Sequence, residues 1–125
     1  MTLTLSILPG EYAVSRLGPG DSPPAWAMRG EFWTVSRTTD ELSALCRADL
    51  VPGDVQTQKG WAALKLHGPF EFTLTGVLAS VLNPLKDAGI GIFAVSTFDT
   101  DYVLVAEEKL EAAVRVLVEA GHQVL

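Results

Sequence analysis

The chain has 125 residues, 48% of them hydrophobic, and fifteen acidic against nine basic side chains give it a formal charge of −6. That length suits one compact domain or two small halves, and the scattered lysines and arginines exclude the clustered positive charge by which proteins bind nucleic acids. No apolar stretch approaches the roughly 20 residues that span a bilayer, and the N-terminus lacks a basic signal region, so the sequence predicts a cytoplasmic protein without membrane contact.

The first residues are predicted to form a β-hairpin. Apolar and polar side chains alternate over residues 3–7, which is typical of a strand with one buried face. Residues 12–17 follow the turn-forming pair Pro9–Gly10 and are expected to pair with this strand as the second arm of the hairpin. Residues 18–24 are rich in turn formers and have no apolar period, so they are expected to form a loop.

A third strand and a short helix are expected next. Residues 32–37 are predicted to form the strand. Thr38 followed three residues later by Glu41 fits a capping box, and the apolar residues behind it predict a short helix that ends near Asp49. The turn-rich segment 51–60 is interpreted as the boundary between two halves of the chain.

The second half is predicted to be a ferredoxin-like βαββαβ unit. Its expected elements are a strand over 61–66, a helix that carries Leu74 to Leu85 and ends at Gly89, strands over 90–98 and 102–106, a helix from Glu107 to Gly121, and a terminal strand over 122–125. In that order two helices cover one face of an antiparallel sheet, so the fold class is α+β. Residues 61–125 are therefore assigned to one domain, and residues 1–60 to an incomplete copy of the same unit.

The residue types provide little catalytic or metal-binding chemistry. His67 and His122 are the only histidines, and with the lone Cys46 they form no zinc-site spacing, so no metal and no cofactor are expected. Cys46 is expected to pack on the apolar side of the short helix. Asp99 and Asp101 could serve with His67 as the acid and base of a small enzyme, which is the least favoured alternative. Because no nucleophile stands beside a base, no catalysis is expected.

The chain resembles the ACT domain family at the helix opening, Thr73-Leu-Thr-Gly-Val-Leu78, and at the strand opening, Ala88-Gly-Ile-Gly-Ile92. It is also similar to the subgroup related to the cytosolic arginine sensors over Ser96-Thr-Phe-Asp-Thr-Asp-Tyr102. The resemblance covers residues 61–125 and extends more weakly to residues 1–60. In that subgroup the weaker region is a second, degenerate ACT-like unit, so tandem units are implied.

The resemblance implies a regulatory, allosteric protein that binds an amino acid or similar metabolite between ACT units and transmits occupancy to a protein partner. Carried over by position, it implies that the ligand contacts the loop before the helix and the facing hairpin. The residues concerned are Thr73, Thr75, Gly76, Gly91, Ile92, Ser96, Thr97, Phe98 and Asp101.

The residues themselves agree with such a ligand. Thr73, Thr75 and the amides around Gly76 can hold a carboxylate at a helix start, while Asp101 suits an ammonium or guanidinium group. Phe98 or Ile92 would line the pocket for the ligand side chain. A homodimer is expected because a four-stranded sheet leaves edges that pairing covers. The alternative is a ligand-free interaction module that docks through the exposed strand edge.

Overall fold

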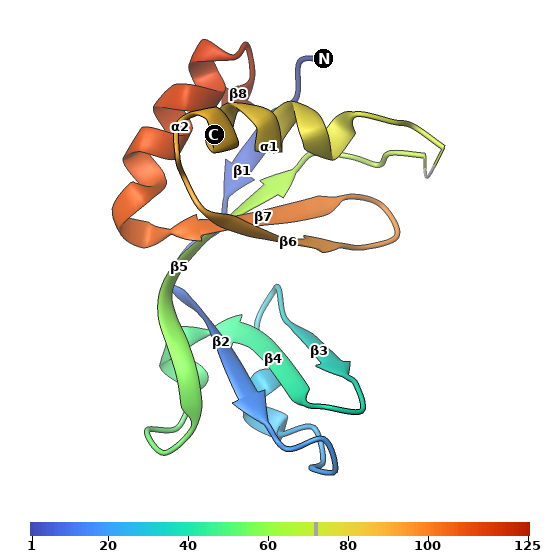
Figure 1. The fold of residues 1–125 in the computed structure, drawn as a ribbon, viewed down its shortest axis with the longest axis vertical. Helices are drawn as coiled ribbons and strands as arrows, with labels where there is room; N and C mark the ends of the chain where they lie inside the picture. Colours follow the sequence, from blue (N-terminus) through green and yellow to red (C-terminus); the bar gives the residue numbers. More distant parts are fainter. Residues whose placement is uncertain (72) are drawn as a thin grey trace. The chain divides into compact units, whose positions relative to one another are not determined.

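The computed structural model describes residues 1–71 and 73–125, which form two compact units (Figure 1). Residues 1–9 and 62–125 make up the first, which we call the discontinuous unit, and residues 10–61 make up the second, the inserted unit. Strand β5 (Gln56–Leu66) contributes its first half to the inserted unit and its second half to the discontinuous unit. The predicted division into 1–60 and 61–125 differs from this one, because residues 1–9 belong with the C-terminal part of the chain.

The discontinuous unit has the predicted α+β, ferredoxin-like architecture. After β5 come α1 (Val77–Asp87), β6 (Ile92–Ser96), β7 (Asp101–Ala106), the 3-10 turn η3 (Glu107–Lys109), α2 (Leu110–Glu119) and β8 (Gln123–Val124). The order of strands in its sheet is β6–β7–β5–β1–β8. The βαββαβ order predicted from residue 61 is therefore confirmed, and one further strand is present in the sheet.

That further strand is β1 (Thr4–Ile7), which lies inside the sheet between β5 and β8. Leu5 pairs antiparallel with Leu66 on one side and parallel with Val124 on the other. The predicted hairpin between residues 3–7 and 12–17 is therefore wrong. A five-stranded sheet buries more of the apolar face under the helices than the four strands of the second half alone.

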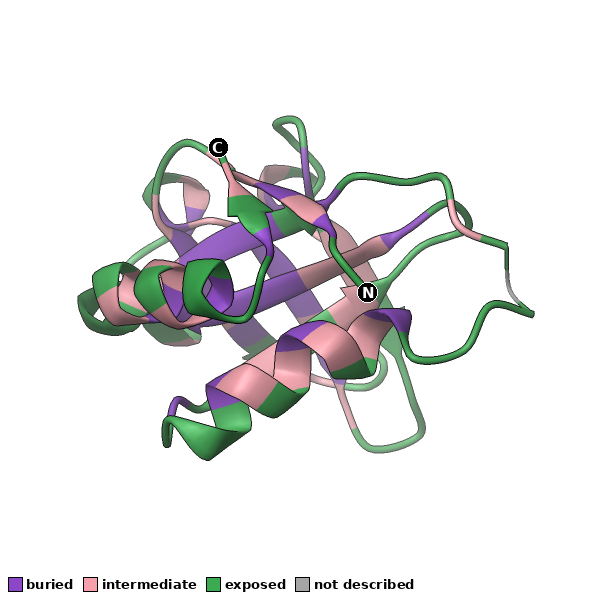
Figure 2. Cartoon of the chain, turned by 90° about the horizontal axis from the view of Figure 1, so that it is seen from above, coloured by how far each residue is buried: buried purple, intermediate pink, exposed green. Residues whose placement is uncertain are grey.

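The core of the discontinuous unit lies between the sheet and its two helices. Val77, Val81 and Leu85 recur every four residues along α1, so they form one buried stripe. Figure 2 shows buried central strands and helices whose outer sides are exposed. The buried cluster comprises Leu3, Leu5, Ala62, Leu64, Leu66, Val77, Val81, Leu85, Ile90, Val103, Val105, Ala113 and Leu117.

His122, directly before β8, links α1 to the residue that precedes β1. It is buried, and its Nε2 atom lies 2.8 Å from the carbonyl oxygen of Ser80 on α1. Its Nδ1 atom accepts a hydrogen bond of 3.1 Å from the amide of Leu3. Both ring nitrogens are thus occupied by backbone groups, which gives this histidine a structural role.

The inserted unit is an antiparallel sheet in the order β3–β4–β2–β5. Its other elements are β2 (Tyr12–Leu17), η1 (Ala25–Ala27), β3 (Thr34–Arg37), β4 (Leu42–Arg47) and η2 (Ala48–Leu50). Small side chains dominate its buried cluster of Ala13, Ala27, Ala44, Cys46, Ala48 and Val51. Neither α-helix of the described chain lies in this unit.

The predicted helix between Thr38 and Asp49 is wrong, because residues 42–47 form β4. Thr38 does interact with Glu41, but the contact closes a hairpin turn. The Thr38 hydroxyl accepts hydrogen bonds of 3.1 Å from the amides of Asp40 and Glu41, and the Thr38 amide donates to the Glu41 carbonyl at 2.9 Å. The turn aligns β3 with β4, where the apolar run is paired on both sides.

No helix in the described part of the chain is both long and apolar enough to cross a membrane.

Candidate functional site

The segment before α1 and the turn between β6 and β7 meet in the discontinuous unit and line a pocket of about 140 Å³. Of the sequence-predicted residues, Ser96, Thr97, Phe98 and Asp101 line it. An adjoining hollow of about 510 Å³ is lined by Thr73 and again by Phe98. The two hollows also share Phe70, Glu71 and Asp99.

The other predicted residues stand apart from this lining. Thr75 and Gly76 are exposed beside it, although their neighbours Leu74 and Val77 do line the smaller pocket. Ile92 lies at the opposite end of β6, roughly 13 Å from Ser96 at about 3.3 Å per residue, and Gly91 directly precedes it. Ile92 packs against the hydrophobic core. The structure therefore gathers the turn residues with the helix approach and leaves Gly91 and Ile92 outside.

Two hydrogen bonds hold the β6–β7 turn against the end of β5 and the segment that follows it. The Phe70 amide donates to the Asp99 carbonyl at 2.7 Å, and the buried Thr100 donates its hydroxyl to the Leu66 carbonyl at 2.7 Å. Gly68 makes this approach possible, because a Cβ atom there would lie 2.7 Å from the Asp99 carbonyl oxygen. The hydrogen bonds to Phe70 and to Leu66 consequently fix the position of the β6–β7 turn that lines the pocket.

Side-chain bonds within the turn orient its polar groups. The Thr97 amide and hydroxyl both donate to the Thr100 carbonyl, at 2.8 and 3.1 Å. The Ser96 hydroxyl donates to one carboxylate oxygen of Asp101. An ionised carboxylate has about four acceptor positions, so Asp101 retains capacity for a further donor.

The pocket lining is acidic and aromatic. Glu71, Asp99 and Asp101 supply carboxylates, and no lysine or arginine is among the described lining residues. The side chain of Phe98 is 80% exposed at the rim, with Phe70 beside the same hollow. This combination favours a ligand group that carries positive charge.

Sequence reasoning missed part of this lining, namely Pro69, Phe70, Glu71, Leu74, Val77, Asp99 and Thr100. The aromatic and acidic side chains directly before the helix, Phe70 and Glu71, were the available signal. Their approach to Asp99 joins positions about thirty residues apart, which no local pattern of the sequence reveals.

The histidine proposed for acid–base chemistry does not line these hollows. His67 contacts the hydroxyl of Ser6 through its Nε2 atom. Within the described residues, no group of three or more histidine, cysteine or acidic side chains is placed to hold a metal ion.

Cys46 is buried on β4, and burial raises the pKa of its thiol, with the Asp49 carboxylate raising it further. The pKa of the Cys46 thiol is therefore higher in the folded chain than in the unfolded chain. Its contribution to the free energy of unfolding is fully present below about pH 8.5 and is lost as the pH rises through the folded-state pKa. We expect native Cys46 to be alkylated by iodoacetamide far more slowly than the denatured chain at the same pH. Mass spectrometry of timed samples measures this, and equal rates would contradict a protected thiol.

The arrangement of strands and helices in the discontinuous unit defines a ferredoxin-like α+β protein. The family model for the ACT domain matches residues 56–119, and the chain belongs to the ACT domain family. A second family model, described as an N-terminal domain, matches residues 10–54 of the inserted unit. A search of curated proteins finds no match.

Solved structures share the fold of the whole chain. Protein Atu0741 from Agobacterium tumefaciens is 46% identical with a TM-score of 0.95, and the match covers 100% of this chain and 93% of that one. VC0802 from Vibrio cholerae, a protein of unknown function and possible transport role, is 16% identical with a TM-score of 0.78 over 96% and 91% of the two chains. The ligand-free regulatory subunit of aspartate kinase from Thermus thermophilus is 15% identical with a TM-score of 0.66 over 95% and 99%. The last two likenesses concern the fold alone.

Proposed function

We propose that this protein is a regulatory, non-catalytic protein that binds an amino acid or similar metabolite between the approach to α1 and the β6–β7 turn. The observation that carries the proposal is the pocket of about 140 Å³ lined by both elements. Membership of the ACT domain family supports it. The fold shared with the regulatory subunit of an aspartate kinase is consistent with a regulatory role.

The charges of the lining indicate the class of ligand. Glu71, Asp99 and Asp101 suit an ammonium or guanidinium group, so a basic amino acid fits better than an acidic one. The backbone amides at the start of α1 offer donors for the ligand carboxylate. Apolar contacts from Leu74 and Val77 would receive the aliphatic part of the ligand.

We extend the proposal to the assembly. Leu74 and Phe98 are large apolar side chains exposed at the rim of the pocket, and a second copy of the chain would cover them. The protein is then a homodimer with its ligand at an interface between ACT units, and it transmits occupancy to a protein partner. We also propose that the inserted unit is a reduced ACT-like unit, as in the subgroup related to the cytosolic arginine sensors.

A thermal melting screen against the twenty amino acids tests the binding site. A ligand at about 100 times its Kd stabilises the folded state by about 2.7 kcal/mol, which raises the midpoint by several degrees. Asp101→Asn removes one charge-assisted contact, so we expect a rise in Kd of about tenfold or more. Asp87→Asn is the matched control, because Asp87 is an exposed aspartate at the far end of α1.

Two outcomes would contradict the proposal. If no amino acid of the panel raises the melting midpoint, the ligand-free interaction module is favoured. If Asp101→Asn and Asp87→Asn raise the Kd equally, Asp101 is not part of the binding site. Light scattering of the same samples measures the assembly, and a mass that stays monomeric at every concentration argues against the dimer.

A further inference from the structure

The candidate ligand site at the β6–β7 turn carries negative charge that its own lining does not balance. Glu71, Asp99 and Asp101 line its two hollows, and no lysine or arginine is among the described lining residues. None of these three carboxylates forms an ion pair with any described residue. The positive charge that balances them therefore has to come from a ligand or from ions in solution.

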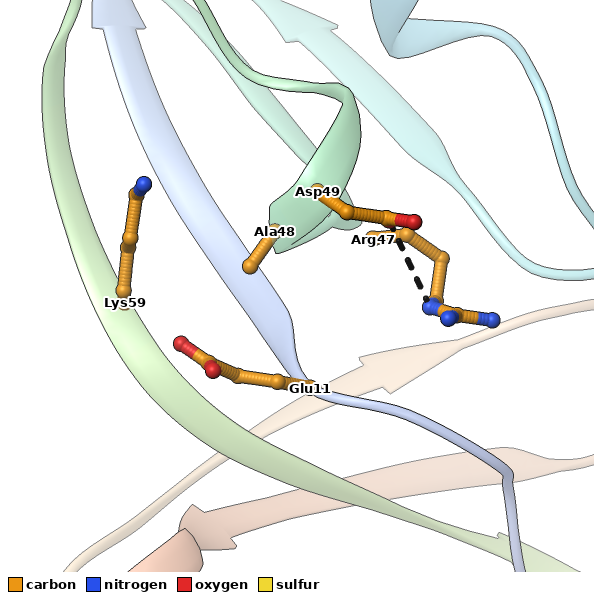
Figure 3. Close-up of a pocket in the computed structure, with 5 residues that line it drawn as sticks. All are labelled: Glu11, Arg47, Ala48, Asp49 and Lys59. Atoms are coloured by element: carbon orange, nitrogen blue, oxygen red, sulfur yellow. Dashed lines mark ion pairs between the residues drawn. The ribbon is translucent and has the colours of Figure 1, made fainter. Parts of the chain in front are cut away.

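The pocket of the inserted unit has a different balance of charge (Figure 3). It has a volume of about 340 Å³, and its lining contains the carboxylates of Glu11 and Asp49 together with the cations of Arg47 and Lys59. Nε of Arg47 lies 3.7 Å from Oδ1 of Asp49, so these two groups already form an ion pair. The unbalanced charge is thus a property of the site at the β6–β7 turn, and the other pocket does not share it.

The start of α1 supplies only a small part of the missing positive charge. The unpaired amides and the dipole of a helix are together equivalent to about +0.5 of an elementary charge at its N-terminus. No acidic residue stands in the first turn of α1, so this partial charge is available to the site. It is much smaller than the charge of three carboxylates, and a ligand carboxylate would add a fourth negative group.

The three carboxylates are spread over both hollows. Asp101 lines only the pocket of about 140 Å³, whereas Glu71 and Asp99 also line the adjoining hollow of about 510 Å³. Within the part of the chain that the structure describes, no three such groups are placed to hold a metal ion. One compact divalent cation therefore does not suit this site, and positive charges distributed along an extended ligand do.

Apolar side chains make up much of the remaining lining. Phe70 and Phe98 line both hollows, and Leu74 and Val77 line the smaller one. Aromatic rings attract ammonium groups through their negatively charged faces, and the 80% exposed Phe98 presents such a ring at the rim. Methylene groups that separate two ammonium groups can pack on the same side chains.

We propose that the ligand of this site is a linear aliphatic diamine or polyamine, which carries ammonium groups on a methylene chain and has no carboxylate. The inference rests on the proposed function and narrows the ligand class of that site. One ammonium group donates to Asp101 in the smaller pocket, and another donates to Glu71 or Asp99 in the adjoining hollow. A basic amino acid offers the same two cations, but its carboxylate leaves it with one net positive charge fewer.

Isothermal titration calorimetry with cadaverine and with lysine tests this proposal. The two compounds differ only in the carboxylate of lysine, so the comparison isolates the effect of that group. The titrations are made at an ionic strength of about 0.15 M, which screens charges more than about 8 Å away. Cadaverine is expected to bind with a Kd about tenfold lower than that of lysine, and the triamine spermidine more tightly still.

Glu71→Gln removes a carboxylate that lines both hollows, and is expected to raise the Kd of cadaverine about tenfold. Glu119→Gln is the matched control. Glu119 is an exposed glutamate at the end of α2, outside both linings, so the Kd of its variant should equal that of the unmodified chain.

The outcomes separate this inference from the proposed function. A Kd for lysine equal to or lower than that for cadaverine overturns the polyamine ligand and leaves an amino-acid site standing. If neither compound binds and the melting screen finds no ligand, the proposed function fails as well. An equal loss of cadaverine affinity in Glu71→Gln and Glu119→Gln would show only general attraction to an acidic surface, which also overturns the inference.

Discussion

Replacing Leu5 with alanine is expected to lower the free energy of unfolding by about 3 kcal/mol, within the range of about 2–5 kcal/mol for buried leucines. Leu5 is 0% exposed and is paired on both sides, with Leu66 of β5 and Val124 of β8. The substitution leaves a cavity at the centre of the sheet, under the helices. Urea denaturation monitored by circular dichroism measures the change.

Ile7→Ala on the same strand provides the control. Ile7 is 38% exposed at the end of β1, so we expect its loss to cost less than about 1.5 kcal/mol. Equal and small effects of the two substitutions would mean that residues 1–9 are not part of the core of the discontinuous unit. A large effect confined to Leu5 supports the insertion of β1 between β5 and β8.

Gly68→Ala is expected to damage the candidate ligand site as well as stability. The new Cβ atom would lie 2.7 Å from the Asp99 carbonyl oxygen and 3.2 Å from the Phe70 amide nitrogen. Both atoms belong to backbone, so the β6–β7 turn has to move away and the hydrogen bond between Phe70 and Asp99 is lost. Overpacking of this kind costs about 1–3 kcal/mol, and the Kd of the ligand found in the melting screen should rise about tenfold.

Gly91→Ala is the matched glycine control at the other end of β6. A Cβ atom there meets nothing within 4 Å, and the φ angle of Gly91 is not in the left-handed region. The structure therefore predicts a small effect on stability and on ligand affinity. A large loss of affinity in Gly91→Ala, with Gly68→Ala unaffected, would move the ligand site to the start of β6.

The helices and the ferredoxin-like order of the second half could be predicted because their signals are local. Val77, Val81 and Leu85 share one side of α1 through the period of the helix, whatever they pack against. Apolar runs on each side of the Asp99–Thr100 turn likewise predict two antiparallel strands. Of the site residues that the family resemblance implied, Thr73, Ser96, Thr97, Phe98 and Asp101 line the two hollows.

The short segment 42–47 shows where local pattern fails. Its sequence Leu-Ser-Ala-Leu-Cys-Arg is too short for periodicity to separate helix from strand. Thr38 and Glu41 have the spacing of a helix cap, yet their backbone bonds close a turn that serves a hairpin equally well. The available partners, β2 and β3, decide the outcome, because the strand gains two ladders of hydrogen bonds.

The sequence by itself determined the order of both α-helices, the hairpin between β6 and β7, and the class of fold, although α1 begins at Val77 rather than near Leu74 and α2 at Leu110 rather than at Glu107. Only the tertiary structure decided that β1 pairs with β5 and β8 in the discontinuous unit instead of with β2. In the same unit the Leu3 amide donates a hydrogen bond to His122, which is 119 positions away. In the inserted unit, the hydrogen bond from the Gly60 amide to the Glu11 carboxylate likewise joins residues 49 positions apart. The periodicity of a sequence indicates which face of a helix or strand is apolar. Which element covers that face depends on the total apolar surface that the whole chain buries.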